Sequence, residues 1–121
     1  MLGMAARKPH ALVYTNTFKE HVKLVERKHH RLIRETLENQ LQYDPEIATR
    51  NRKPLKKPMA FEAEWELRFG PANRFRVFYR VDGNDVVLLA FGEKTRDRLT
   101  IGGQEVEDEK SNAGKGPGTP S

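Results

Sequence analysis

The chain has 121 residues, a formal net charge of +5 and no cysteine. This length gives room for one domain, and the absence of cysteine excludes disulfides, thiol catalysis and the usual thiolate zinc site. The excess of basic side chains favours anionic partners such as nucleic acid or an acidic protein segment, with simple solubility as the alternative. The first seven residues are too short and too weakly apolar for a signal peptide, and no stretch approaches the ~20 apolar residues of a membrane span. We therefore expect a cytoplasmic protein without membrane association.

The first third of the chain predicts a strand followed by helices. Residues 10–14 (HALVY) form a short apolar run that is typical of a strand. Thr17 and Glu20 have the spacing of a capping box and predict the start of a helix. Apolar residues then recur at steps of three and four as far as residue 41, with a break near residues 28–30. This pattern fits either two short antiparallel helices or one kinked helix. We expect the two antiparallel helices, which form a helical hairpin.

A basic segment follows the helical region. Asp44-Pro45 ends the helical pattern because proline disfavours helical geometry in the residue before it. Residues 50–58 hold two prolines and show no periodicity, so we expect a loop. Its five cations are Arg50, Arg52, Lys53, Lys56 and Lys57. They are candidate contacts to an RNA backbone, because each phosphate that they neutralise releases counterions; a flexible, solubilising loop is the alternative.

The second half of the chain predicts a sheet. Polar and apolar residues alternate in its first two segments, which is typical of half-buried strands, whereas the third is apolar throughout and fits a strand buried on both faces. The four predicted strands are residues 61–69, 75–81, 86–91 and 99–101. From residue 104 onward the composition turns to Glu, Lys, Ser, Gly and Pro, which predicts disorder. The chain is thus expected to form one α+β domain over residues 1–103, followed by a disordered tail over residues 104–121.

Five segments together resemble the RelE/ParE superfamily of bacterial toxins. They correspond to parts of the family's helix end, connecting loop, central hairpin and last core strand, at residues 41–45 (LQYDP), 49–55 (TRNRKPL), 65–70 (WELRFG), 75–79 (FRVFY) and 89–94 (LAFGEK). Their order and spacing carry the resemblance, which covers residues 11–103. The resemblance implies an N-terminal strand and an α-helical hairpin packed on a mostly antiparallel sheet of four or five strands. It also implies a cognate antitoxin protein as a partner.

Two arginines are the first candidates for a catalytic site. Metal-free cleavage of RNA requires a base for the 2′-hydroxyl, cations for the charge that gathers on phosphorus, and an acid for the leaving oxygen. Arginine suits the second role because its planar guanidinium binds phosphate oxygens bidentately and stays charged. Arg68 and Arg76 occupy polar positions on neighbouring predicted strands, and the resemblance places Arg76 first and Arg68 second. A solvated sheet face paired with glutamates is the alternative. We expect Arg76 to point to solvent, so that its replacement by alanine leaves the fold intact.

Four further residues complete the predicted site. Glu66 lies where RelE-like nucleases tend to carry a basic residue; it is either a general base or a salt-bridge partner of the two arginines, and the pattern favours the salt bridge. Lys94 and Arg96 match the region where the family places a further cation, with an ordinary charged strand end as the alternative. Arg74 is a candidate RNA contact. The family's nucleases often end with a tyrosine or histidine, but none follows Tyr79, which alternates with apolar residues and is expected in the core.

The resemblance and these residues together predict the toxin of a type II toxin–antitoxin system. We expect a ribosome-associated mRNA endonuclease that represses translation and needs no metal or organic cofactor. A ParE-like inhibitor of DNA gyrase without chemistry of its own is the second interpretation, and an inactive member that only binds its antitoxin is the third. The antitoxin is expected to present an acidic or amphipathic segment to the basic hairpin face, which is formed by Arg68, Arg74, Arg76 and Arg80.

Overall fold

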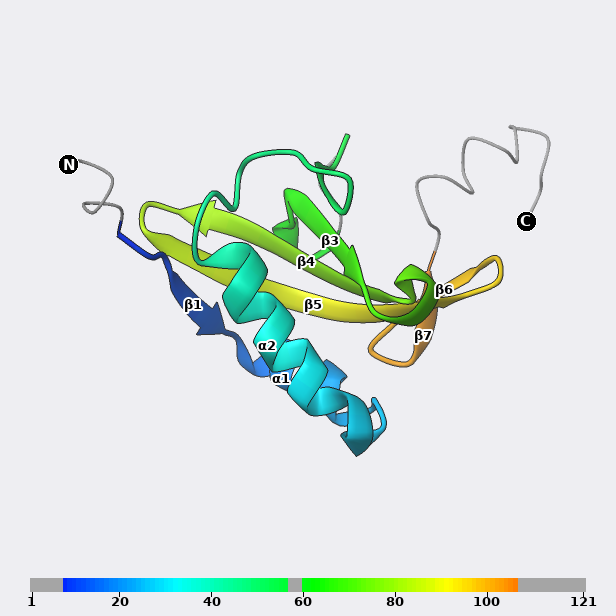
Figure 1. Cartoon of the computed structure of the whole chain (residues 1–121). Helices are drawn as coiled ribbons and strands as arrows, with labels where there is room; N and C mark the ends of the chain where they lie inside the picture. Colours follow the sequence, from blue (N-terminus) through cyan, green and yellow to red (C-terminus); the bar gives the residue numbers. More distant parts are fainter. Residues whose placement is uncertain (1–7, 57–59, 107–121) are drawn as a thin grey trace.

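Seven strands form one sheet in the computed structural model, which describes residues 8–56 and 60–106 (Figure 1). The strands are β1 (Ala11–Tyr14), β2 (Arg52–Pro54), β3 (Trp65–Phe69), β4 (Phe75–Asp82), β5 (Asp85–Thr95), β6 (Arg98–Ile101) and β7 (Gln104–Val106). Two helices lie between the first two strands in sequence, α1 (Asn16–Lys23) and α2 (His30–Leu41). The α+β class predicted from the sequence is confirmed. Neither helix of this described part is long and apolar enough to cross a membrane.

The sheet is organised around β5, its longest strand. Strands β2 to β7 follow one another in antiparallel order, whereas β1 pairs with β5 in parallel. The pairing with β1 uses the first part of β5, from Asp85 to Leu88, and the pairing with β6 uses the last part, from Gly92 to Thr95. The prediction of a mostly antiparallel sheet is therefore confirmed, but the predicted number of strands, four or five, was too low.

The extra strands lie where the sequence predicts a loop and a tail. β2 occupies the middle of the predicted basic loop and pairs with β3, with Lys53 opposite Glu66. β7 occupies the first three residues of the predicted tail. It folds back on β6 through Gly102 and Gly103, whose positive φ angles of 62° and 82° glycine adopts without steric cost. The remainder of the predicted tail, residues 107–121, lies outside the described residues.

Helix α1 begins two residues earlier than the sequence predicts. Its N-cap is Thr15, whose hydroxyl accepts a hydrogen bond from the Phe18 amide at 3.2 Å and donates one to the Leu88 carbonyl at 2.7 Å. The predicted capping box at Thr17 is wrong because Thr15, directly after β1, reaches the neighbouring strand as well as the helix. The break before α2 confirms two separate helices, and the His30 ring lies 2.8 Å from the Val25 carbonyl there.

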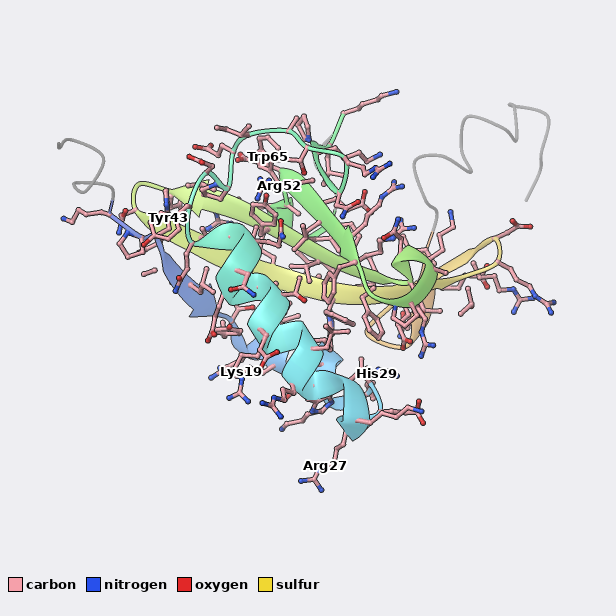
Figure 2. The ribbon with its side chains drawn as sticks, viewed as in Figure 1. Lys19, Arg27, His29, Tyr43, Arg52 and Trp65 are labelled. Atoms are coloured by element: carbon pink, nitrogen blue, oxygen red, sulfur yellow. The ribbon has the colours of Figure 1, made fainter. Side chains whose placement is uncertain are left out.

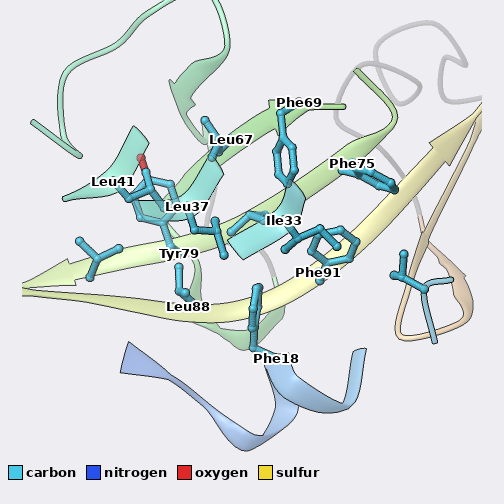
Figure 3. Close-up of a cluster of buried hydrophobic side chains, with 13 residues drawn as sticks. Phe18, Ile33, Leu37, Leu41, Leu67, Phe69, Phe75, Tyr79, Leu88 and Phe91 are labelled. Atoms are coloured by element: carbon cyan, nitrogen blue, oxygen red, sulfur yellow. The ribbon is translucent and has the colours of Figure 1, made fainter. Parts of the chain in front are cut away.

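The main core lies between the helices and one face of the sheet (Figure 3). Apolar side chains of both helices meet those of β3, β4 and β5, and the largest buried one is Tyr79. The Tyr79 hydroxyl donates to the Pro45 carbonyl at 2.6 Å, so the segment after α2 is attached to the sheet. Burial raises the pKa of Tyr79 far above its ordinary value, which keeps this hydroxyl protonated. Its predicted place in the core is confirmed.

The other face of the sheet also carries buried side chains. A second, smaller apolar cluster comprises Ala63, Phe78, Ala90, Leu99 and Ile101. A bulge in the pairing of β4 with β5 lies between Phe78 and Tyr79, next to this cluster. Strand β4 is consequently buried on both faces over most of its length. A charged side chain on β4 therefore needs an internal partner.

His21 links α1 to β5 through its ring. Its Nδ1 accepts a hydrogen bond from the Phe91 amide at 3.2 Å, which requires an unprotonated Nδ1. Burial of the imidazole lowers the pKa of His21, and the Glu20 carboxylate opposes this shift in part. The neutral ring thus fits the folded state better than the charged one.

We predict that acid destabilises the fold through His21. Because its pKa is lower in the folded chain than the ~6.5 of an unfolded chain, unfolding takes up a proton below that pH. The stability that the neutral His21 ring contributes above pH about 6.5 is then lost as the pH falls toward the pKa of His21 in the folded chain. His21→Asn keeps an acceptor for the Phe91 amide but does not titrate, so its Tm should fall less than that of the wild type between pH 7.5 and 5. Parallel declines of the two proteins would contradict this role.

Candidate site: a charged cluster and a basic hollow

A buried carboxylate, Glu66, lies between cations from three strands. Glu66 Oε1 is 3.2 Å from Arg68 Nε and 3.8 Å from Lys53 Nζ, and Glu66 Oε2 is 3.3 Å from Arg76 Nη1. Lys53 lies opposite Glu66 in the pairing of β2 with β3, and Arg68 lies opposite Arg76 in the pairing of β3 with β4. We call these four residues the Glu66 cluster. The predicted pairing of the two arginines on one face is confirmed, as is the predicted salt bridge.

The burial of Arg76 contradicts our expectation that it points to solvent. Only 5% of Arg76 and 2% of Glu66 is exposed, whereas the side chains of Arg68 and Lys53 are 19% and 39% exposed. Arg76 also donates from Nε to the Asn73 carbonyl at 3.2 Å. The reason is its strand, since β4 is covered on both faces. Arg76 is therefore part of the structure as well as of the candidate site, and its replacement by alanine is not a neutral test.

A hollow of about 430 Å³ adjoins this cluster. It lies between the turn that joins β3 to β4 and the turn that joins β5 to β6. Its lining residues are Pro71, Ala72, Arg74, Arg76, Lys94, Thr95 and Arg96. We call it the basic hollow. Four of the predicted site residues thus meet at one place, and none of the residues that line it is acidic.

Arg74 is held at the edge of the basic hollow by two contacts. Its Nε donates to Glu93 Oε2 at 2.9 Å, and its guanidinium carbon lies 5.3 Å from the centre of the Phe75 ring. Glu93 lies opposite Phe75 in the pairing of β4 with β5. Glu93 is not among the predicted site residues, although its position in a polar strand end is a signal that could have found it. The Glu93 carboxylate fixes the direction of the Arg74 side chain.

Arg52 is buried and binds backbone carbonyls of the chain itself. Only 7% of the residue is exposed, and its guanidinium donates to the carbonyls of Gln40 and Ile47. Gln40 lies in the last turn of α2, where backbone carbonyls lack partners within the helix and a positive charge is favourable. Arg52 therefore stabilises the end of α2 against β2 (Figure 2). The open loop predicted at this position is wrong, because Arg52–Pro54 forms strand β2.

The other cations of the predicted loop have separate environments. Lys53 belongs to the Glu66 cluster, while Arg50 is exposed and precedes strand β2. Lys56 is exposed at the end of the segment, and Lys57 lies outside the described residues. The side chain of Lys53 thus extends the cationic surface that begins at the basic hollow.

The described residues contain no group of three or more potential metal ligands from His, Asp and Glu. A scan against protein-family models, a search of curated proteins and a search of solved structures found no match to the chain. The chemistry of the charged residues themselves is therefore the basis for any functional proposal.

We predict that Arg52→Met destabilises the chain by about 2 kcal/mol, because two hydrogen bonds from the charged guanidinium to backbone carbonyls would be lost. Urea unfolding followed by circular dichroism measures the free energy of unfolding. The matched change, Arg50→Met, removes an exposed cation two residues away and should cost less than about 0.5 kcal/mol. Similar losses for the two variants would contradict the structural role of Arg52.

A second prediction concerns Glu66. Glu66→Gln leaves the buried Arg76 without its carboxylate, so we expect a loss of about 3 kcal/mol in the free energy of unfolding. Glu64→Gln is the control, because Glu64 is exposed and precedes the same strand. A stable Glu66→Gln variant would show that the ion pair contributes little to the fold.

Proposed function

We propose that this chain is the toxin of a type II toxin–antitoxin system and that it acts as a ribosome-associated mRNA endonuclease. One observation carries the proposal: the basic hollow gathers Arg76 and Lys94 from strands β4 and β5, and Arg74 and Arg96 from the turns beside them. Cations from different elements that converge on one concave surface are suited to phosphate. The order of strand, helix pair and antiparallel strands, with β1 parallel to β5, supports the RelE/ParE-like arrangement that the sequence resemblance implies.

In this proposal a phosphate of the message binds in the basic hollow. The 2′-oxygen forms a bond to the adjacent phosphorus and the bond to the 5′-oxygen breaks, while one proton leaves the 2′-hydroxyl and one reaches the 5′-oxygen. Charge gathers on the phosphate oxygens during this step, and Arg76 and Lys94 stabilise it. Glu66 and Glu93 act as positioning residues, because each carboxylate holds an arginine of the hollow in place.

The cationic surface also extends away from the hollow. Along the Glu66 cluster, Arg76 leads to Arg68 and then to Lys53. A single strand of RNA that crosses β4, β3 and β2 would meet positive charge at each strand. Binding of this kind depends strongly on salt, because the phosphates release counterions.

A second function, inhibition of DNA gyrase by binding alone, is favoured by a specific observation. The residues that line the basic hollow include no histidine, tyrosine or carboxylate that could transfer a proton. The charged surface would then recognise an acidic region of the enzyme or its DNA.

The test compares the two functions with one pair of variants. We expect purified protein to produce new RNA 5′ ends on translating ribosomes, and Lys94→Ala/Arg96→Ala to reduce their rate of formation by about 100-fold. Arg27→Ala/Lys28→Ala removes the same charge from the helical side of the molecule and should leave the rate within about twofold, as expected when exposed charges are far from the site. Intact messages together with blocked DNA supercoiling would support the gyrase inhibitor instead. Growth that is unaffected by expression of the chain without a partner would indicate an inactive member.

A further inference from the structure

The arginines of the β3–β4 hairpin face already have internal acidic partners. Arg68 and Arg76 bind Glu66, and Arg74 binds Glu93. The fourth one, Arg80, lies 3.2 Å from an oxygen of Asp82 and 3.7 Å from one of Glu62. An acidic partner segment placed over this face, as the sequence predicts, would compete with carboxylates of the chain itself.

A different surface, between α1 and α2, combines apolar side chains with cations. It is a groove of about 210 Å³ whose apolar part comes from Tyr14, Phe18, Val22 and Ile33, and whose exposed surface is mainly apolar. This volume accepts one or two apolar side chains. Apolar grooves between helices are a common docking site for an amphipathic helix.

Three cations surround this groove: Lys19 and Lys23 from α1, and Arg34 from α2. All three are exposed, and none of them forms an ion pair within the described residues. They differ in this respect from Lys28 and Arg31 nearby, which pair with Glu26 and Glu35. Figure 2 shows Lys19 extending from the helical side of the molecule. The groove therefore offers three cations that have no ion-pair partner in the described part of the chain.

We infer that this groove binds an acidic amphipathic helix of a partner protein, with one or two apolar side chains inserted between α1 and α2 and carboxylates directed toward Lys19, Lys23 and Arg34. The apolar floor supplies affinity and the unpaired cations select acidic partners. The inference does not depend on what the basic hollow binds.

The experiment is a selection of helical 18-residue peptides from a random library against the full chain. We expect the selected peptides to be amphipathic, with apolar residues three or four positions apart and flanking Asp or Glu. Binding of the best peptide, measured by fluorescence anisotropy, should weaken at least 10-fold in Lys19→Glu/Lys23→Glu. Arg27→Glu/Lys28→Glu is the matched control, because it reverses the same charge on the helical side but does not line the groove, and it should change the affinity less than about twofold. Val22→Asp, which places a charge in the groove, should also abolish binding.

Several results would overturn the inference. These are the absence of binders, selected peptides without acidic residues, or equal losses in the two charge-reversed variants. Self-association of the chain that Lys19→Glu/Lys23→Glu abolishes would show that a second copy occupies the groove instead. Because neither lysine lines the basic hollow, Lys19→Glu/Lys23→Glu should leave any effect on RNA or gyrase unchanged, so that a failure here is distinguishable from a failure of the proposed function.

Discussion

The carboxylate of Glu66 makes it possible for cations to occupy the middle of this sheet. Two arginines directly opposite each other on β3 and β4 would repel, and one of them is almost wholly buried. Glu66 lies within ion-pair distance of both, and it attracts Lys53 from β2 as well. The cluster still carries more positive than negative charge, so it holds the cations in place without removing their attraction for an anion. The position of Arg76 in the wall of the basic hollow depends on this arrangement.

Local patterns in the sequence predict much of the fold. The alternation on either side of Gly70 indicates the β3–β4 hairpin, and it places Arg68 opposite Arg76. Gly70 itself is required there, because its φ of 85° and the Phe75 ring, 2.4 Å from where a Cβ would lie, both exclude a side chain. The apolar run after residue 85 likewise predicts the buried β5. In each case the signal lies within a few neighbouring residues.

What the sequence does not predict depends on contacts between distant residues. β2 and β7 have three residues each, too few for a periodic pattern to emerge. Arg52 resembles the other cations of its segment, and only the position of the end of α2 shows that it binds carbonyls there. Arg76 alternates with apolar residues in the sequence, as an exposed strand residue would. In the structure, however, the second apolar cluster lies on the same face of the sheet and buries it. The sequence predicts the cations of the basic hollow, which all lie near turns. It does not predict the groove between α1 and α2, because this groove forms only when the two helices pack together.

The parallel pairing of β1 with β5 has a consequence for how the domain forms during synthesis. Ala11 lies opposite Asp85, so the first strand and the two helices leave the ribosome well before the strand that completes their core. Contacts between such distant segments form late, since the intervening chain must be ordered first. Lys94 and Arg96 are synthesised later still, because they lie at the C-terminal end of β5 and directly after it. A partially synthesised chain thus has neither its sheet nor the basic hollow, and the groove between the helices is completed at the same time as the rest of the domain.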